Sequence, residues 1–192
     1  TSGTITASNV TTVTGDSASV TSAYTSGGIT GLGDEAVTLS DTEISATVLN
    51  TLDGKTTGAI DASKLTKITG TGTDAKTAFE SAGISGLTFD ASNYLASYSD
   101  LLTAFGNDLA TAKAHYFANG VSEGRSFDAF DETSYLASYS DLLGAFGTST
   151  DKALIHYINN GYSEGRVADS FDENSYLASN TSLIGTVTDA AA

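Results

Sequence analysis

The only two histidines of this sequence are the residues whose type and spacing could most readily do chemistry. His115 and His156 are 41 residues apart, and each is followed by a tyrosine, Tyr116 and Tyr157. An imidazole can ligate a metal or transfer a proton near neutral pH. Recurrence favours another interpretation, because catalysis needs one asymmetric set of groups whereas a repeated unit copies its packing contacts. We therefore predict a scaffolding role for both His–Tyr pairs.

The only two arginines lie in the same repeated frame. The segment Glu123–Arg125 recurs as Glu164–Arg166, with a glycine in the middle of each. A guanidinium could bind a carboxylate or sugar ligand, or it could form a salt bridge within the protein. We predict the internal salt bridge, with the adjacent glutamate or the nearby Asp128 and Asp169 as partners.

Acidic pairs are the candidates for a metal site, because carboxylate oxygens suit calcium. None of them has the spacing of a helix–loop–helix calcium loop, and the sequence lacks glycine-rich nonapeptides that bind calcium. Helix capping and exposed surface explain most of these acids. We expect no required cofactor, and Ca²⁺ is the candidate ion. The pairs that recur are the favoured ligands: Asp131, Glu132, Asp172 and Glu173.

Charge and composition exclude several functions. Lys and Arg number 8 against 23 Asp and Glu, so the net charge is −15. Such a chain lacks the basic face that nucleic acids and anionic membranes require, and no apolar stretch is long enough to span a membrane. There is no cysteine for disulfide or thiolate chemistry. We also find no nucleophile elbow, phosphate loop or zinc-protease motif, and we expect no enzymatic activity.

Two repeat systems position these residues. Residues 89–129 align with 130–170 without a gap, and a third copy starts at Phe171 and fades after Ser179. Asp90 is expected to cap a helix, and Ser99 or Asp100 to cap the next turn, Leu101 to Phe105. A second helix is expected from about Asp108 to Asn119. Each 41-residue unit is then a helical hairpin. The tyrosines at helical spacing are either core residues, which we favour, or an exposed sugar platform: Tyr94, Tyr98, Tyr116, Tyr135, Tyr139, Tyr157 and Tyr176.

The N-terminal system has a 55-residue period, because residues 3–32 align with 58–87. Its apolar pattern predicts a strand at Val37–Leu39, then a helix capped by Ser40–Asp41 that ends at Gly54. An irregular strand follows in Ala59–Thr69. A helix follows over Thr73–Ala82 and is closed by a left-handed Gly83. Strand and helix alternate about every 27 residues, which favours stacking into a parallel sheet.

The predicted fold is an α+β repeat protein. A short right-handed β/α solenoid over residues 1–88 is followed by stacked helical-hairpin repeats over residues 89–192. The solenoid holds one and a half copies of its unit, and the hairpin region two full copies and a partial third. Because the chain opens in the middle of a 55-residue unit, we expect it to be a piece of a longer array.

The frame Tyr135–Leu143, with His156-Tyr157 and Ser163–Arg166, resembles a repeat of large secreted and surface proteins of cyanobacteria and alphaproteobacteria. A related pattern flanks some bacterial glycosyltransferases, commonly with Pro where this chain has Ser99 and Ser140. The N-terminal Thr-rich units are similar to arrays in giant surface proteins of the same kind. The resemblance implies an extracellular or cell-surface location and attaches no catalytic residue to either repeat.

These observations predict a secreted, non-enzymatic structural protein, a self-assembling subunit of a surface layer (S-layer), filament or matrix. Its partners would be copies of itself. The apolar segment Leu183–Val187 is expected to be a strand that docks on a neighbouring copy. The alternative is an adhesion module, from an adhesin or viral fibre, that binds cell-surface polysaccharide through exposed tyrosines.

Overall fold

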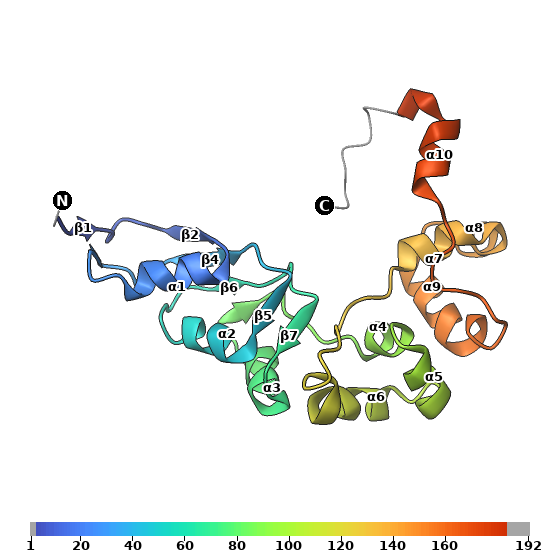
Figure 1. Ribbon diagram of the computed structural model, residues 1–192, viewed down its shortest axis with the longest axis horizontal. Coiled ribbons are helices and arrows are strands. Elements are labelled where there is room, and N and C mark those ends of the chain that lie inside the picture. Colours follow the sequence, from blue (N-terminus) through green and yellow to red (C-terminus); the bar gives the residue numbers. More distant parts are fainter. Residues whose placement is uncertain (1–2, 184–192) are drawn as a thin grey trace. The chain divides into compact units, whose positions relative to one another are not determined.

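The computed structural model describes residues 3–183, which combine helices with parallel sheets (Figure 1). The chain divides into two compact units, Thr1–Phe130 and Asp131–Ala192, and each is described by itself. Strands give way to helices after Ser85. That change lies near the predicted limit of the two repeat systems at residue 88, whereas the division into compact units follows the first helical hairpin.

The strands of the first unit are short and all pair in parallel. They are β1 (Ile5–Thr6), β2 (Thr12–Gly15), β3 (Ile29–Thr30), β4 (Ala36–Leu39), β5 (Glu43–Ser45), β6 (Ile60–Asp61), β7 (Lys67–Thr69) and β8 (Ile84–Ser85). The main sheet has the order β2-β4-β6-β8, and β1-β3 and β5-β7 form two smaller sheets. Thr12 pairs with Ala36, and Ile60 pairs with Ile84. We call these stacked parallel strands and the helices between them the ladder. In both pairs the partner residues are 24 positions apart in the sequence, slightly fewer than the predicted spacing of about 27 residues.

Three helices connect the strands of this ladder: α1 (Ser17–Thr25), α2 (Ala46–Asp53) and α3 (Gly72–Glu80). The parallel sheet predicted from the sequence is confirmed. Its core contains the apolar residues that the pattern in Ala59–Thr69 selected, since Ile60, Ala62, Leu65 and Ile68 are all buried.

Two predicted helix ends in the ladder are wrong. Ser40–Asp41 does not cap α2, whose N-cap is Ser45, because the chain first forms β5. The Asp41 carboxylate instead accepts the backbone N–H of Ser17 at 2.7 Å, at the start of α1. Gly83 does not close α3, because the C-cap is Ser81 in an extended conformation.

The first helical hairpin completes the first unit with α4 (Ala91–Ala96), α5 (Ser99–Phe105), α6 (Leu109–His115) and the π-helical turn η1 (Tyr116–Gly120). Asp90 caps α4 as predicted, and Asp108, near the predicted start of the next long helix, caps α6. The N-cap of α5 is Tyr98, so the cap predicted at Ser99 or Asp100 is wrong. This frees the Asp100 carboxylate for a contact outside its own helix.

The aromatic ring of Phe79 in α3 joins this hairpin to the ladder. The ring makes edge-on contacts with Phe89, Tyr116, Phe117 and Phe127, at centroid distances of 5.9, 6.2, 5.7 and 5.2 Å. Helix α3 also packs on η1. The first hairpin therefore covers the end of the ladder formed by α3.

The second unit repeats the hairpin with α7 (Glu132–Ser138), α8 (Ser140–Phe146), α9 (Thr150–His156) and η2 (Tyr157–Gly161), followed by α10 (Glu173–Ser179) and the 3₁₀ turn η3 (Thr181–Leu183). In residues 3–183, no helix has the length and apolar character needed to cross a membrane. The docking strand predicted at Leu183–Val187 falls, apart from its first residue, outside the described residues.

Candidate functional site

The predicted Glu–Gly–Arg turn forms a salt-bridge centre. Arg125 donates from Nη1 and Nη2 to the two carboxylate oxygens of Asp100, at 3.0 and 2.7 Å, and from Nε to Glu123 at 2.6 Å. The backbone of Gly124 has a φ of +71°, a conformation that suits glycine and turns the chain back, so that Glu123 and Arg125 face each other. The guanidinium also lies over the Tyr98 ring, 4.6 Å from its centroid.

These contacts confirm the predicted salt bridge of Arg125 with the adjacent glutamate. The predicted aspartate partner is wrong. The partner is Asp100 of α5, which comes 25 residues earlier in the chain, rather than Asp128. The guanidinium hydrogen bonds lower the pKa of Asp100, and the two carboxylates raise the pKa of Arg125. Burial raises the pKa of Asp128, and the charge of Asp90 adds to that effect.

The second unit contains the same centre. Arg166 donates to both carboxylate oxygens of Asp141 at 3.0 and 2.7 Å, and to Glu164 at 2.7 Å. Its guanidinium lies 4.7 Å from the centroid of Tyr139. Asp169, the other predicted partner, accepts the backbone N–H of Phe171 instead.

Each histidine extends its centre towards a buried tyrosine. His115 Nδ1 shares a hydrogen bond of 2.9 Å with the Tyr94 hydroxyl, and its Nε2 lies 3.9 Å from Oε1 of Glu123. In the second unit, His156 Nδ1 lies 3.0 Å from the Tyr135 hydroxyl. The Nε2 atom of the same ring lies 4.0 Å from Glu164. The two rings therefore occupy equivalent positions.

The tyrosines at the inner end are core residues. Tyr94, Tyr116 and Tyr135 are 0% exposed, and Tyr157 is also buried. Burial raises the pKa of Tyr135 to about 12 and raises the pKa of Tyr94 and Tyr116 as well. The core interpretation of these four tyrosines is confirmed, and they cannot form a surface platform.

The polar chain Tyr–His–Glu–Arg–Asp ties all three α-helices of a hairpin to its closing turn. Chemically, a tyrosine–histidine–glutamate series could pass a proton. The two copies have matching distances, however, and each ends in a carboxylate already bound to an arginine. This geometry fits the scaffolding role predicted for the His–Tyr and Glu–Gly–Arg residues.

The four predicted calcium ligands lie at the starts of helices. Asp131 caps α7 by accepting the Ser134 N–H at 2.8 Å, and Asp172 caps α10 by accepting the Ser175 N–H at 2.9 Å. Glu132 and Glu173 are the first residues of those helices. Over residues 3–183, no group of three or more His, Cys, Asp or Glu side chains is placed to hold a metal ion. Calcium binding stays a prediction.

A buried carboxylate of the ladder is not indicated by the sequence. Glu35 is 1% exposed and accepts hydrogen bonds from the Tyr24 hydroxyl and from the N–H groups of Gly33 and Asp34. Burial raises its pKa, but the hydrogen bonds, that of Tyr24 foremost, outweigh burial and leave the pKa lowered. In the sequence, Glu35 is one half of an acidic pair that looks exposed, and nothing local indicates its contact with Tyr24 of α1.

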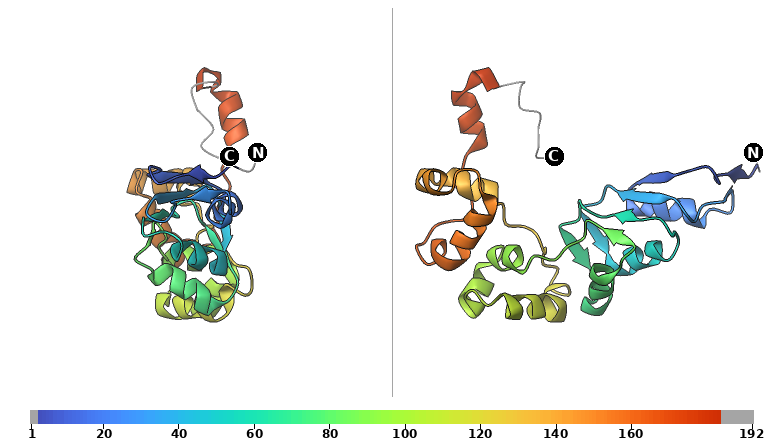
Figure 2. Two further views of the ribbon diagram at one scale, coloured as in Figure 1. Left: turned by 90° about the vertical axis from the view of Figure 1, so that its left-hand side faces the viewer. Right: turned by 180° about the vertical axis from the view of Figure 1, so that it is seen from behind.

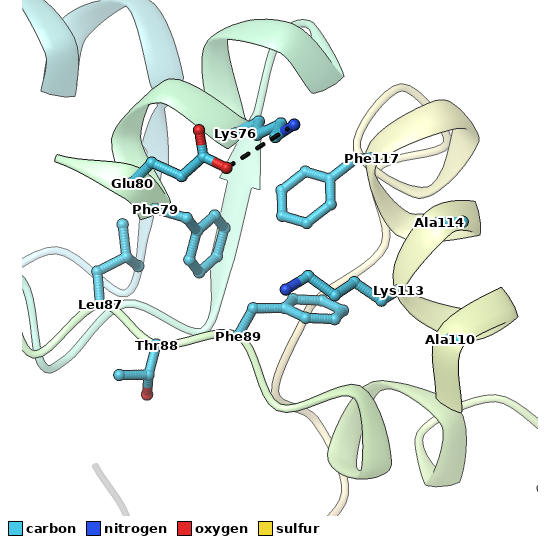
Figure 3. A pocket seen from close by; sticks show the side chains of 10 residues that line it. All are labelled: Lys76, Phe79, Glu80, Leu87, Thr88, Phe89, Ala110, Lys113, Ala114 and Phe117. Atoms are coloured by element: carbon cyan, nitrogen blue, oxygen red, sulfur yellow. Dashed lines mark ion pairs between the residues drawn. The ribbon is translucent and has the colours of Figure 1, made fainter. Parts of the chain in front are cut away.

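The first unit also contains a cavity of about 590 Å³ between α3 and α6 (Figure 3). Phe79, Phe89 and Phe117 form its aromatic wall, and Lys76 and Lys113 lie at its rim. Its size is in the range of small-ligand sites. A second cavity, of about 240 Å³, lies beside His156 in the other unit.

Comparison with protein-family models, with curated proteins and with solved structures found no match to this chain.

Proposed function

We propose that this chain is a non-enzymatic structural protein of the cell surface or extracellular matrix, a subunit that assembles with copies of itself. In this proposal the parallel ladder is a short right-handed β/α solenoid and the helical hairpins are stacked repeats. The observation that supports this proposal most directly is a difference between the two ends of the ladder. One end is covered and the other is open.

At the covered end, α3 packs under the first hairpin through Phe79. At the other end, β2 pairs with β4. Within residues 3–183 no strand pairs with the outer edge of β2 or of β8, and the hairpin packs on α3 near β8. Strand β1, which pairs with β3 rather than with β2, lies at the N-terminal end of the ribbon (Figure 2), and Ile5 of β1 is 63% exposed.

Apart from the shortness of its strands, the open edge lacks the side-chain features that normally protect the edge of a sheet. Natural edge strands carry lysine, proline or a bulge that prevents pairing with another molecule. Neither Ile5–Thr6 nor Thr12–Gly15 contains any charge or proline. An edge of this kind supports pairing with a second copy, and a contact between unlike surfaces propagates into a polymer unless it closes.

Other features support the surface location. A chain with a net charge of −15 repels its copies until salt or cations screen it, which suits assembly outside the cell. The duplicated Tyr–His–Glu–Arg–Asp centre supports a structural rather than catalytic purpose. The buried tyrosines weaken the alternative of polysaccharide binding through an aromatic platform.

The experiment is negative-stain electron microscopy of the purified chain with calcium and then with chelator. We expect filaments or sheets for the natural chain, and we expect Thr14→Lys to prevent them. Thr14 is exposed on β2, and lysine on an edge strand opposes pairing. Thr77→Lys, an equal change on the exposed side of α3, is the matched control. Monomers under every condition would refute self-assembly, and loss of polymers on chelation would identify a required cation.

A further inference from the structure

Helix α10 has the sequence of a core helix but not its burial. It shares Tyr-Leu-Ala with α4 and α7. Tyr94 and Tyr135 are 0% exposed in those helices, whereas the equivalent Tyr176 is 49% exposed. Helices α6 and α9 cover the first two, and within residues 3–183 no such helix follows α10.

The uncovered surface of α10 is aromatic and acidic. The rings of Phe171 and Tyr176 are in contact, with centroids 5.5 Å apart. Glu173 precedes Tyr176 by three residues and therefore lies on the same side of the helix. No residue of α10 is buried, and only Leu177 is half-buried, so most of the helix surface is accessible to a partner.

The cavity of the first unit has the complementary character. It is formed against the outer side of α6, whose inner side covers α4 through Ala112 and the adjoining Tyr116. Small and aromatic residues of α6 and η1 line it: Ala110, Ala114 and Phe117. The alanines let another helix come close, and the phenylalanines offer ring edges and faces to an aromatic side chain.

Two lysines and one glutamate, Lys76, Lys113 and Glu80, line the cavity, which gives it one net positive charge in a strongly acidic chain. Lys76 is paired with Glu80 at 3.7 Å. Lys113 forms no ion pair with any residue of 3–183, and its side chain lines the cavity together with that of Phe89 (Figure 3). An anionic group next to aromatic rings is the partner that this rim favours.

We propose that Phe171 and Tyr176 of one copy insert into this cavity on a second copy, with Glu173 placed beside Lys113. The contact repeats the burial of α4 and α7 against a second helix, but with the outer side of α6 from another molecule. It joins unlike surfaces and therefore propagates. It rests on the proposed self-assembly and names a site and partner for it.

A helix of seven residues buries little area, which places this contact among weak interfaces. It acts together with the ladder edge, because copies already joined at one contact meet the other at high effective concentration. Removing it should shift assembly to higher protein concentration rather than unfold the chain.

The test uses charge reversal in the full chain, followed by sedimentation velocity and electron microscopy. Lys113→Glu and Glu173→Lys should each raise the concentration at which half the protein is assembled by about tenfold. The double variant should restore assembly, because the pair is re-formed with the charges exchanged. Lys55→Glu is the matched control, since Lys55 is exposed and lies outside the cavity. Circular dichroism establishes that each variant is folded.

The outcomes separate this inference from the proposed function. Assembly that Thr14→Lys prevents but Lys113→Glu leaves unchanged would overturn the cavity contact while self-assembly stands. Failure of the double variant to recover would also overturn it. Unchanged assembly together with saturable binding of phenylacetate, lost in Lys113→Glu, would assign the cavity to a small anionic ligand instead. A natural chain that stays monomeric would refute both proposals.

Discussion

Arg125 holds Asp100 with two parallel hydrogen bonds, from Nη1 at 3.0 Å and Nη2 at 2.7 Å, across 25 residues of chain. The pair connects the start of α5 to the turn that follows η1. Arg166 and Asp141 repeat it in the second unit at the same two distances. The same polar contact therefore holds a helix and the following turn together in each of the two compact units.

We expect Arg125→Lys to lower the stability of the first unit by about 1 kcal/mol, because lysine keeps the charge but cannot form the planar fork. The effect is modest since the Asp100 side chain is 61% exposed. Chemical denaturation of Arg125→Lys, Asp100→Asn and the double variant measures it as a thermodynamic cycle. Strictly additive effects would show that the two side chains are not coupled.

The buried Glu35 should make the ladder sensitive to acid. Its pKa in the folded protein is lowered from the ordinary value of 4.5, so its contribution to stability is present above that pH and is lost as the pH falls below it. Glu35→Gln should cost about 1–3 kcal/mol at neutral pH and flatten the decline of Tm in acid. Asp34→Asn, at the exposed neighbour, is the control and should change neither. An equally steep decline in Glu35→Gln would contradict the assignment.

Tyr135 should make the second unit sensitive to alkali. Its pKa is raised by burial from 10.0 to about 12, so the unfolded chain loses this proton first. The stability that the neutral hydroxyl provides is complete below pH 10 and is lost as the pH rises towards 12. Tyr135→Phe removes the bond to His156, costs about 1 kcal/mol near neutral pH, and weakens the alkaline decline. Thermal melts against pH measure this, with Tyr176→Phe at the equivalent exposed position as control.

The sequence predicted the helices and strands better than the caps at their ends and the contacts between them. Apolar spacing was sufficient for the parallel strands and for the buried set Ile60, Ala62, Leu65 and Ile68, because one face of each must be covered. It misassigned Asp41 and Asp100, which both precede or begin a helix and look like local caps. Their carboxylates instead bind Ser17 and Arg125, 24 and 25 residues away. A short polar side chain satisfies either a local or a distant donor equally well, and only the stacking of the chain decides which one is near.

The same limit explains the other differences. The sequence predicts a left-handed helix cap at Gly83, but in the structure this residue lies against the Asp53 carboxylate. Glycine there serves close approach rather than backbone rotation. The burial of Glu35 and the aromatic contacts of Phe79 depend on segments that are far apart in the sequence, so no local sequence pattern predicts them. The exposure of Tyr176 was likewise hidden, because its local sequence matches that of two buried tyrosines.

Gly72 at the start of α3 should tolerate no side chain. A Cβ atom at this position would collide with the backbone carbonyl of Phe117, so Gly72→Ala must push η1 away from α3. Alanine normally favours a helix over glycine by up to about 1 kcal/mol, but here we expect a net loss of about 1–3 kcal/mol from overpacking. Gly144→Ala in α8 is the matched control, because nothing lies within 4 Å of its Cβ position and it should stabilise its helix. Denaturation of the two variants should therefore give opposite signs, and a stabilised Gly72→Ala would show that the first hairpin does not cover the ladder.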